Sequence, residues 1–175
     1  LCDWSSDVCS SDLNIWKLPT ESTPVLVDNF HIFSHMECDQ CDFEFVELQV
    51  AGLVDQALQA AGERFSRTHA YLKIDIEPDL PPIVGDPDAL VTVIMNLLDN
   101  AWQYSRDNRE IRIKAVMRGK FVCLKIIDNG IGMAPRVVRR IFNRFHQAKP
   151  TPASSGRCGL GLHIAKFIID AHGGA

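Results

Sequence analysis

The stretch NLLDNAWQYS, residues 96–105, decides how this chain is read. It continues the mostly apolar run DALVTVIM at 88–95, so the spacing predicts one helix with a face in the core. Burying an amide without a hydrogen-bond partner in a core costs free energy. At about 100° per residue along a helix, the polar side chains fall in one stripe beside an apolar stripe. The polar stripe consists of Asn96, Asn100, Gln103 and Tyr104, and the apolar stripe of Leu90, Ile94, Leu97, Leu98 and Ala101. The pattern predicts that the amides hold a polar ligand, and the alternative is a helix flank with chance amides.

The flanking sequence predicts an alternation of helices and strands. Asp86 as N-cap with Pro87 in the first turn predicts that the amide-bearing helix runs from Pro87 to about Ser105. Alternation and turn residues predict strands at 42–48, 71–76, 110–118 and 120–128, with a short extended piece at 83–84 and a hairpin at Gly119. Helical spacing predicts further helices over 50–69, 135–141 and 159–172, the last one closed by Gly173.

Composition favours one soluble domain with flanking sequence. The chain has 175 residues, 46% hydrophobic and 23% charged, with a net charge of −4. This balance predicts no nucleic-acid partner and no membrane contact by this fragment. No apolar run approaches the roughly 20 residues that span a bilayer. The six cysteines are scattered, and Cys38-x-x-Cys41 lacks the second pair that a zinc site needs.

Two glycine-rich stretches follow the amide helix. DNGIGM at 128–133 ends a predicted strand with a carboxylate, and its glycines would let the backbone approach a ligand closely. GRCGLGL at 156–162 opens the last predicted helix. Neither stretch matches the dinucleotide fingerprint or the phosphate loop of other nucleotide-binding folds. Taken alone, a turn explains each of them as well, and Asp128 with Asn129 could simply cap the turn after the strand.

Taken in order, these stretches resemble the ATP-binding catalytic domain of sensor histidine kinases, in the superfamily shared with DNA gyrase, heat-shock chaperones and mismatch-repair ATPases. NLLDNAWQY resembles the N box, DNGIGM and GRCGLGL the two glycine boxes, and IFNRF at 141–145 the phenylalanine box. The resemblance covers about 43–175 and implies an α/β two-layer sandwich. It would have a mixed β-sheet, helices on one face, a mobile ATP lid over 143–158 and truncated final strands. Residues 14–42 are then a linker with the end of a dimerisation helix. DWSSDVCSSDL at 3–13 resembles translated sequencing-adapter DNA, so 1–13 are excluded from the fold.

The resemblance also implies roles for single residues. Asn100 would be the magnesium ligand and Asn96 a second polar contact, Tyr104 would pack beside adenine, and Asp128 would accept the adenine amino hydrogen. Phe142 and Phe145 are expected to anchor the lid in the core, and Arg144 either reaches phosphate or is solvated. The ATP-binding residues implied are Asn96, Asn100, Gln103, Tyr104, Asp128, Gly130, Gly132, Met133, Phe145, Gly156, Gly159, Leu160, Gly161 and Leu162.

A kinase is favoured over a hydrolase. The related ATPases place a glutamate where Asn96 stands, and an amide cannot activate water at neutral pH.

The resemblance implies transfer of the γ-phosphoryl group of ATP to a histidine, with a response regulator as the next partner and a homodimer formed through a dimerisation domain. No His-Glu or His-Asp acceptor dipeptide occurs in the chain, so autophosphorylation is not expected, and no catalytic residue is assigned. The expected localisation is cytoplasmic, on a parent whose membrane anchoring is left open. A truncated or degenerate nucleotide-binding module is the alternative.

Overall fold

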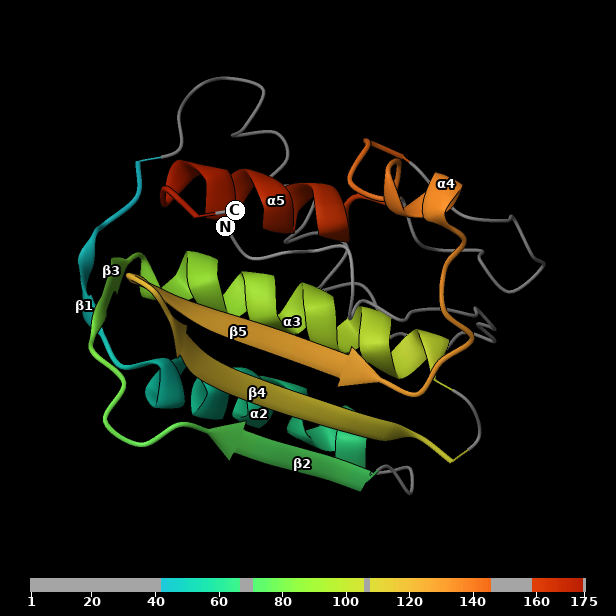
Figure 1. Ribbon diagram of the computed structural model, residues 1–175, viewed down its shortest axis with the longest axis horizontal. Helices are drawn as coiled ribbons and strands as arrows, with labels where there is room; N and C mark the ends of the chain where they lie inside the picture. The colour runs from blue at the N-terminus through green and yellow to red at the C-terminus, as the bar shows by residue number, and fades with distance from the viewer. Residues whose placement is uncertain (1–41, 67–70, 106–107, 146–158, 175) are drawn as a thin grey trace.

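The computed structural model describes residues 42–66, 71–105, 108–145 and 159–174 (Figure 1). Predictions that fall on Cys38, Cys41, Gly156 and residues 146–158 lie outside the described residues. The elements, in chain order, are β1 (Val46–Leu48), α2 (Val50–Ser66), β2 (Tyr71–Ile76), β3 (Ile83–Gly85), α3 (Pro87–Tyr104), β4 (Glu110–Arg118), β5 (Phe121–Asp128), α4 (Pro135–Val138) and α5 (Gly161–Ala171).

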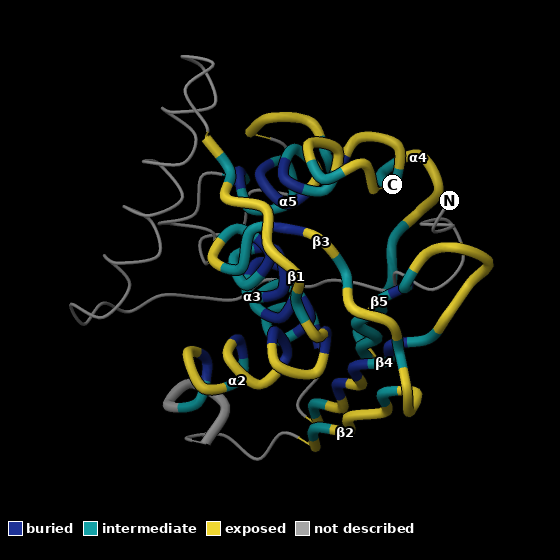
Figure 2. The backbone as a smooth tube through the Cα atoms, turned by 90° about the vertical axis from the view of Figure 1, so that its left-hand side faces the viewer, coloured by how far each residue is buried: buried dark blue, intermediate teal, exposed yellow. Residues whose placement is uncertain are grey.

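The predicted α/β two-layer sandwich is confirmed. Figure 2 shows α5, α3 and α2 stacked on one side and β5, β4 and β2 on the other. In this mixed sheet β4 is central, pairing with β2 in parallel and with β5 antiparallel. The strands β1 and β3 do not join it, because they pair with each other in a separate two-stranded sheet. The expected single mixed sheet is therefore two sheets.

The central strand β4 shows why the helices cover only one face. Its alternate residues Ile111, Ile113 and Ala115 are almost completely buried, while Arg112 is exposed on the opposite face. Directly paired residues of neighbouring strands point to the same face. Since Asp128 pairs with Ile111, this carboxylate lies on the inner, helix-covered face.

The helix α3 begins and ends where the sequence predicts. Asp86 is the N-cap, its Oδ1 accepting the Ala89 N–H at 2.9 Å, and Ser105 is the C-cap. α3 packs against α2, α5 and β5, so it lies at the centre of the helical layer. Asn96 belongs to the polar stripe, yet it is only 6% exposed, because α5 covers the flank of α3 that carries it.

The boundaries of several elements differ from the predicted ones. The strand predicted over 42–48 is confined to β1, since β3 offers only three pairing partners. α4 ends at Val138, and the chain then turns so that Ile141 is buried at 7% exposure. α5 begins at Gly161 and ends at Ala171. Within the described residues, no helix is both long and apolar enough to cross a membrane.

Candidate functional site

The first turn of α5 is seated on the side chain of Asn96 from α3. A methyl group placed on Gly161 would lie 2.8 Å from Asn96 Oδ1 and 3.3 Å from its Cγ. Real Cβ atoms do not approach this closely, so a larger residue at position 161 would force Asn96 or the start of α5 to shift. The amide stripe and the second glycine stretch are therefore in contact at Asn96 and Gly161.

The N-terminus of α5 has the character of an anion site. Its N-cap, Leu160, makes no side-chain capping hydrogen bond, and the preceding Gly159 has a φ of 65°. The first amide groups of a helix have no partner inside the helix, and the helix dipole favours negative charge beside them. An anionic group would be stabilised at this position. Leu160 itself is 5% exposed and belongs to the hydrophobic core.

Asp128 ends β5 with a partly buried carboxylate. Its Oδ1 accepts the Gly130 N–H at 2.8 Å, so the capping role that the sequence left open is real. No other hydrogen bond to this carboxylate exists among the described residues. Burial raises the pKa of Asp128, and the hydrogen bond from Gly130 opposes the shift. Asp128 Oδ2 is thus left to accept a hydrogen bond from a ligand.

Gly130 brings the end of β5 against the end of α3. A methyl group on Gly130 would overlap the backbone carbonyl oxygen of Tyr104 and would also crowd Asp128 Oδ1. The next glycine, Gly132, has a φ of 72°, which only glycine adopts easily. The carboxylate of Asp128 and the end of the amide helix at Tyr104 are therefore adjacent, as the resemblance implied.

The side chain of Asn129 makes two exposed hydrogen bonds beside Asp128. Its Oδ1 accepts the Glu110 N–H at 3.1 Å, and its Nδ2 donates to the Asn108 carbonyl at 2.6 Å. The side chain joins the end of β5 to the start of β4, so Asn129 has a structural role and holds Asp128 in register.

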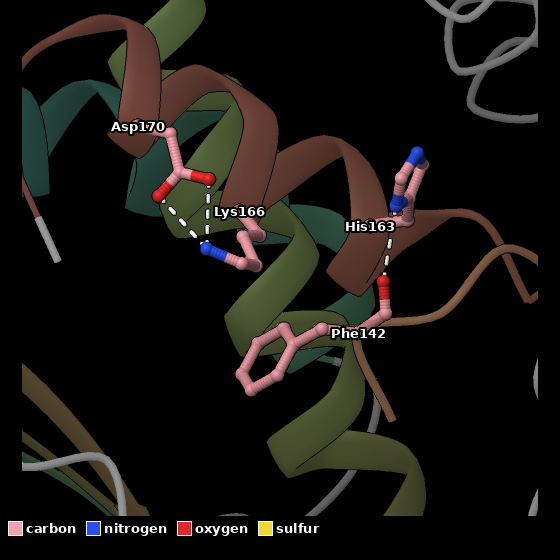
Figure 3. A network of polar contacts seen from close by, with 4 residues as sticks. All are labelled: Phe142, His163, Lys166 and Asp170. Carbon is pink, nitrogen blue, oxygen red and sulfur yellow. Dashed lines mark hydrogen bonds and ion pairs between the residues drawn. The ribbon is translucent and has the colours of Figure 1, made fainter. Parts of the chain in front are cut away.

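His163 was not predicted to take part, and the sequence carries no signal for it. Its Nδ1 lies 3.0 Å from the carbonyl oxygen of Phe142 (Figure 3). A carbonyl can only accept, so Nδ1 carries the proton. The other ring nitrogen, Nε2, is buried and has no hydrogen-bond partner among the described residues. This bond ties the segment after α4 to the first turn of α5.

Several predicted site residues are not brought into this arrangement by any described contact. Phe145 is 63% exposed with a φ of 57°, so the expectation that it anchors in the core is wrong: its backbone turn directs the ring outward. Four more are half-buried: Asn100, Gln103, Met133 and Leu162. Within the described part of the chain, no group of three His, Cys, Asp or Glu side chains could hold a metal.

Comparison with known proteins finds one matching family and several similar proteins. Residues 85–175 match the family described as histidine kinase-, DNA gyrase B-, and HSP90-like ATPase. The chain is 36% identical over 134 residues to the sensor protein KdpD of Clostridium acetobutylicum, covering 76% of this chain and 14% of KdpD. It is 30% identical over 150 residues to the signal transduction histidine-protein kinase BaeS of Escherichia coli, covering 85% of this chain and 32% of BaeS.

A solved structure shares the fold. Full-length ShkA, crystallised in complex with AMPPNP, superimposes with a TM-score of 0.73 at 22% identity, covering 88% of this chain and 32% of ShkA. The present chain spans less than a third of the length of KdpD, BaeS or ShkA.

Proposed function

Because the chain belongs to the histidine kinase-, DNA gyrase B-, and HSP90-like ATPase family, and within it to the catalytic ATP-binding domains of sensor histidine kinases, we propose that it binds Mg-ATP along α3. The observation that supports this proposal is that the end of β5 and the start of α5 both contact α3, each through a glycine. Gly130 brings Asp128 to the end of α3, and Gly161 seats the N-terminus of α5 on Asn96 of the same helix. Adenine would lie at the first junction and the phosphates at the second.

The chemistry of the residues fits a purine and its phosphates. Asp128 presents a carboxylate oxygen to which no described residue donates a hydrogen bond. This oxygen can accept the exocyclic amino hydrogen of adenine, but it cannot pair with the carbonyl of guanine. The free amide groups at the start of α5 can donate to phosphate oxygens. Tyr104, whose backbone meets Gly130, carries an aromatic ring that could pack against the base. Asn96 supports the phosphate end by positioning α5 beneath it.

Asn100 is the residue proposed to hold magnesium. It lies one turn from Asn96 on α3, between the two junctions, and it is half-buried. Magnesium prefers oxygen ligands and usually keeps several waters, so one amide oxygen with phosphate oxygens suffices. The described residues offer no cluster of carboxylates that would replace it. When bound, the ion would neutralise part of the phosphate charge.

The position of Asn96 favours phosphoryl transfer over ATP hydrolysis. A carboxylate would be needed to activate water, and this amide is buried against Gly161. Transfer to a histidine needs positioning and charge stabilisation instead. We infer that the parent protein passes phosphate from ATP to a histidine and then to a response regulator, as a homodimer.

Titration calorimetry with ATP, with and without magnesium, tests the binding site. Asn100→Ala and Asp128→Ala should each abolish measurable binding, Asn100→Ala by removing the metal ligand and Asp128→Ala by removing the base contact. Asp55→Ala, on the exposed face of α2, is a matched control and should bind normally. Normal binding by either site variant would require a different site.

The kinase function is tested separately from binding. Incubation of this chain with γ-labelled ATP should leave no acid-labile phosphate on it, because no acceptor dipeptide is present. Addition of a dimerisation domain that carries an acceptor histidine should allow labelling of that domain. Binding without any labelling would favour the alternative, a nucleotide-binding module without kinase activity.

A further inference from the structure

Positive charge is concentrated in one part of this acidic chain. Between Asn129 and Ile169 there are seven Lys and Arg residues and no Asp or Glu. The remaining residues hold eleven Lys and Arg against twenty-two Asp and Glu, and the whole chain has a net charge of −4. Such separation of charge creates a local field that the net charge conceals.

Three of these cations lie close together in the chain. Arg136, Arg139 and Arg140 lie on α4 and the turn that follows it, and all three are exposed. Their side chains make no ion pair or hydrogen bond with any part of the chain that the structure describes. Neighbouring like charges repel each other, so this cluster, here called the arginine rim, does not stabilise the fold.

The arginine rim lies beside the phosphate end of the proposed site. The loop that follows Asp128 leads directly into α4, and the hydrogen bond from His163 to the Phe142 carbonyl holds the segment after the rim against the first turn of α5. Figure 1 shows α4 next to the end of α5 at which that helix begins. An anion approaching the N-terminus of α5 therefore passes this cluster.

We propose that the arginine rim steers nucleotide polyphosphates electrostatically into the site and so raises their association rate. This inference rests on the proposed function and adds residues that the binding site itself does not use. Exposed guanidinium groups add little to the energy of a bound state in water. Their field reaches about 10 Å at 0.1 M salt, which is enough to bias the approach of an anion.

Stopped-flow binding of a fluorescent ATP analogue tests the arginine rim with charge-matched variants. The rim variant is Arg139→Gln with Arg140→Gln. The control is Arg118→Gln with Lys120→Gln, at the hairpin where β5 begins. The eight residues of β5 span roughly 27 Å and separate the control from α4.

At low ionic strength the rim variant should associate about fivefold more slowly than the unchanged chain, with an unchanged dissociation rate. The difference should shrink at high salt, and the control should stay near the unchanged chain. Equal slowing in both variants, or an effect confined to dissociation, would overturn the steering role. Absence of binding by the unchanged chain would remove the proposed function and the steering role with it, whereas binding with equal association rates would remove the steering role alone.

Discussion

At the scale of the residue, Asp128, the proposed acceptor for adenine, carries a cost to folding. Burial raises the pKa of Asp128 in the folded chain, so the folded state binds a proton more readily than the unfolded state. The contribution of Asp128 to folding stability therefore falls as pH rises through this raised pKa, and the ionised carboxylate disfavours folding at neutral pH. The proposed contact with adenine uses the same ionised form as an acceptor.

Asp128→Asn should separate these two effects. The amide oxygen can still accept the Gly130 N–H, so the melting temperature at neutral pH should rise slightly, and the rise should vanish in acid. Loss of a hydrogen bond to a charged acceptor costs about 1.5–3 kcal/mol, so ATP affinity should fall at least roughly tenfold. Melting curves across pH and calorimetry measure both, with Asp55→Asn as control. A destabilised variant that kept full affinity would contradict this account.

Gly161 is the second residue whose identity matters. In Gly161→Ala the new methyl group would meet Asn96 Oδ1 at 2.8 Å, so either the buried Asn96 side chain or the first turn of α5 must shift. Overpacking of this kind costs about 1–3 kcal/mol, and ATP affinity should fall with the displaced helix start.

Gly52→Ala in α2 is the matched control for Gly161→Ala, because nothing lies within 4 Å of its new methyl group. It should stabilise the helix by roughly 0.5–1 kcal/mol. Urea unfolding compares the two variants. Similar effects at both positions would show that the contact with Asn96 is unimportant.

At the scale of the element, His172 joins three segments that are distant in sequence. Its Nε2 accepts the Asp86 N–H at 3.0 Å and its Nδ1 donates to the Ile168 carbonyl at 2.7 Å. The rings of Phe43 and Phe45 pack on the imidazole, with centroids 5.1 and 4.8 Å away. The start of α3, the end of α5 and the segment before β1 are thus held at one ring.

His172→Ala should destabilise the fold by about 1–3 kcal/mol, because the Asp86 N–H loses its acceptor in a partly buried position. Lys166→Ala on the same helix removes only an exposed ion pair with Asp170, which is worth about 0.3–0.5 kcal/mol. Urea unfolding distinguishes them. If His172→Ala were as mild as Lys166→Ala, the imidazole would not be holding these elements together.

At the scale of the whole molecule, ligand binding should stabilise the fold selectively. A ligand present at one hundred times its dissociation constant adds about 2.7 kcal/mol to the free energy of unfolding. Mg-ATP should therefore raise the melting temperature clearly, chelation of magnesium should reduce the effect, and Mg-GTP should have little effect because its base presents a carbonyl to Asp128. An equal response to both nucleotides would contradict the proposed role of Asp128.

The elements that depend on neighbouring residues were predictable from the sequence. The strand over 71–76, the helix start at Asp86-Pro87 and the hairpin at Gly119 follow from periodicity, capping and turn chemistry, and the structure confirms all three. The exposure of Phe145 was not predictable, because the resemblance of IFNRF to the phenylalanine box implied that this ring enters the core. The backbone turn at that position overrides the pattern.

The sequence by itself determined the order of the elements and the amide stripe of α3, since each depends on residues a few positions apart. The two-layer class was implied by the family resemblance of the sequence. Tertiary structure alone decided which segments contact each other. α5 buries Asn96, Gly130 meets Tyr104, and His172 accepts a hydrogen bond from Asp86. These contacts join segments far apart in the chain, and their geometry depends on how helices and strands pack. No local pattern specifies that packing.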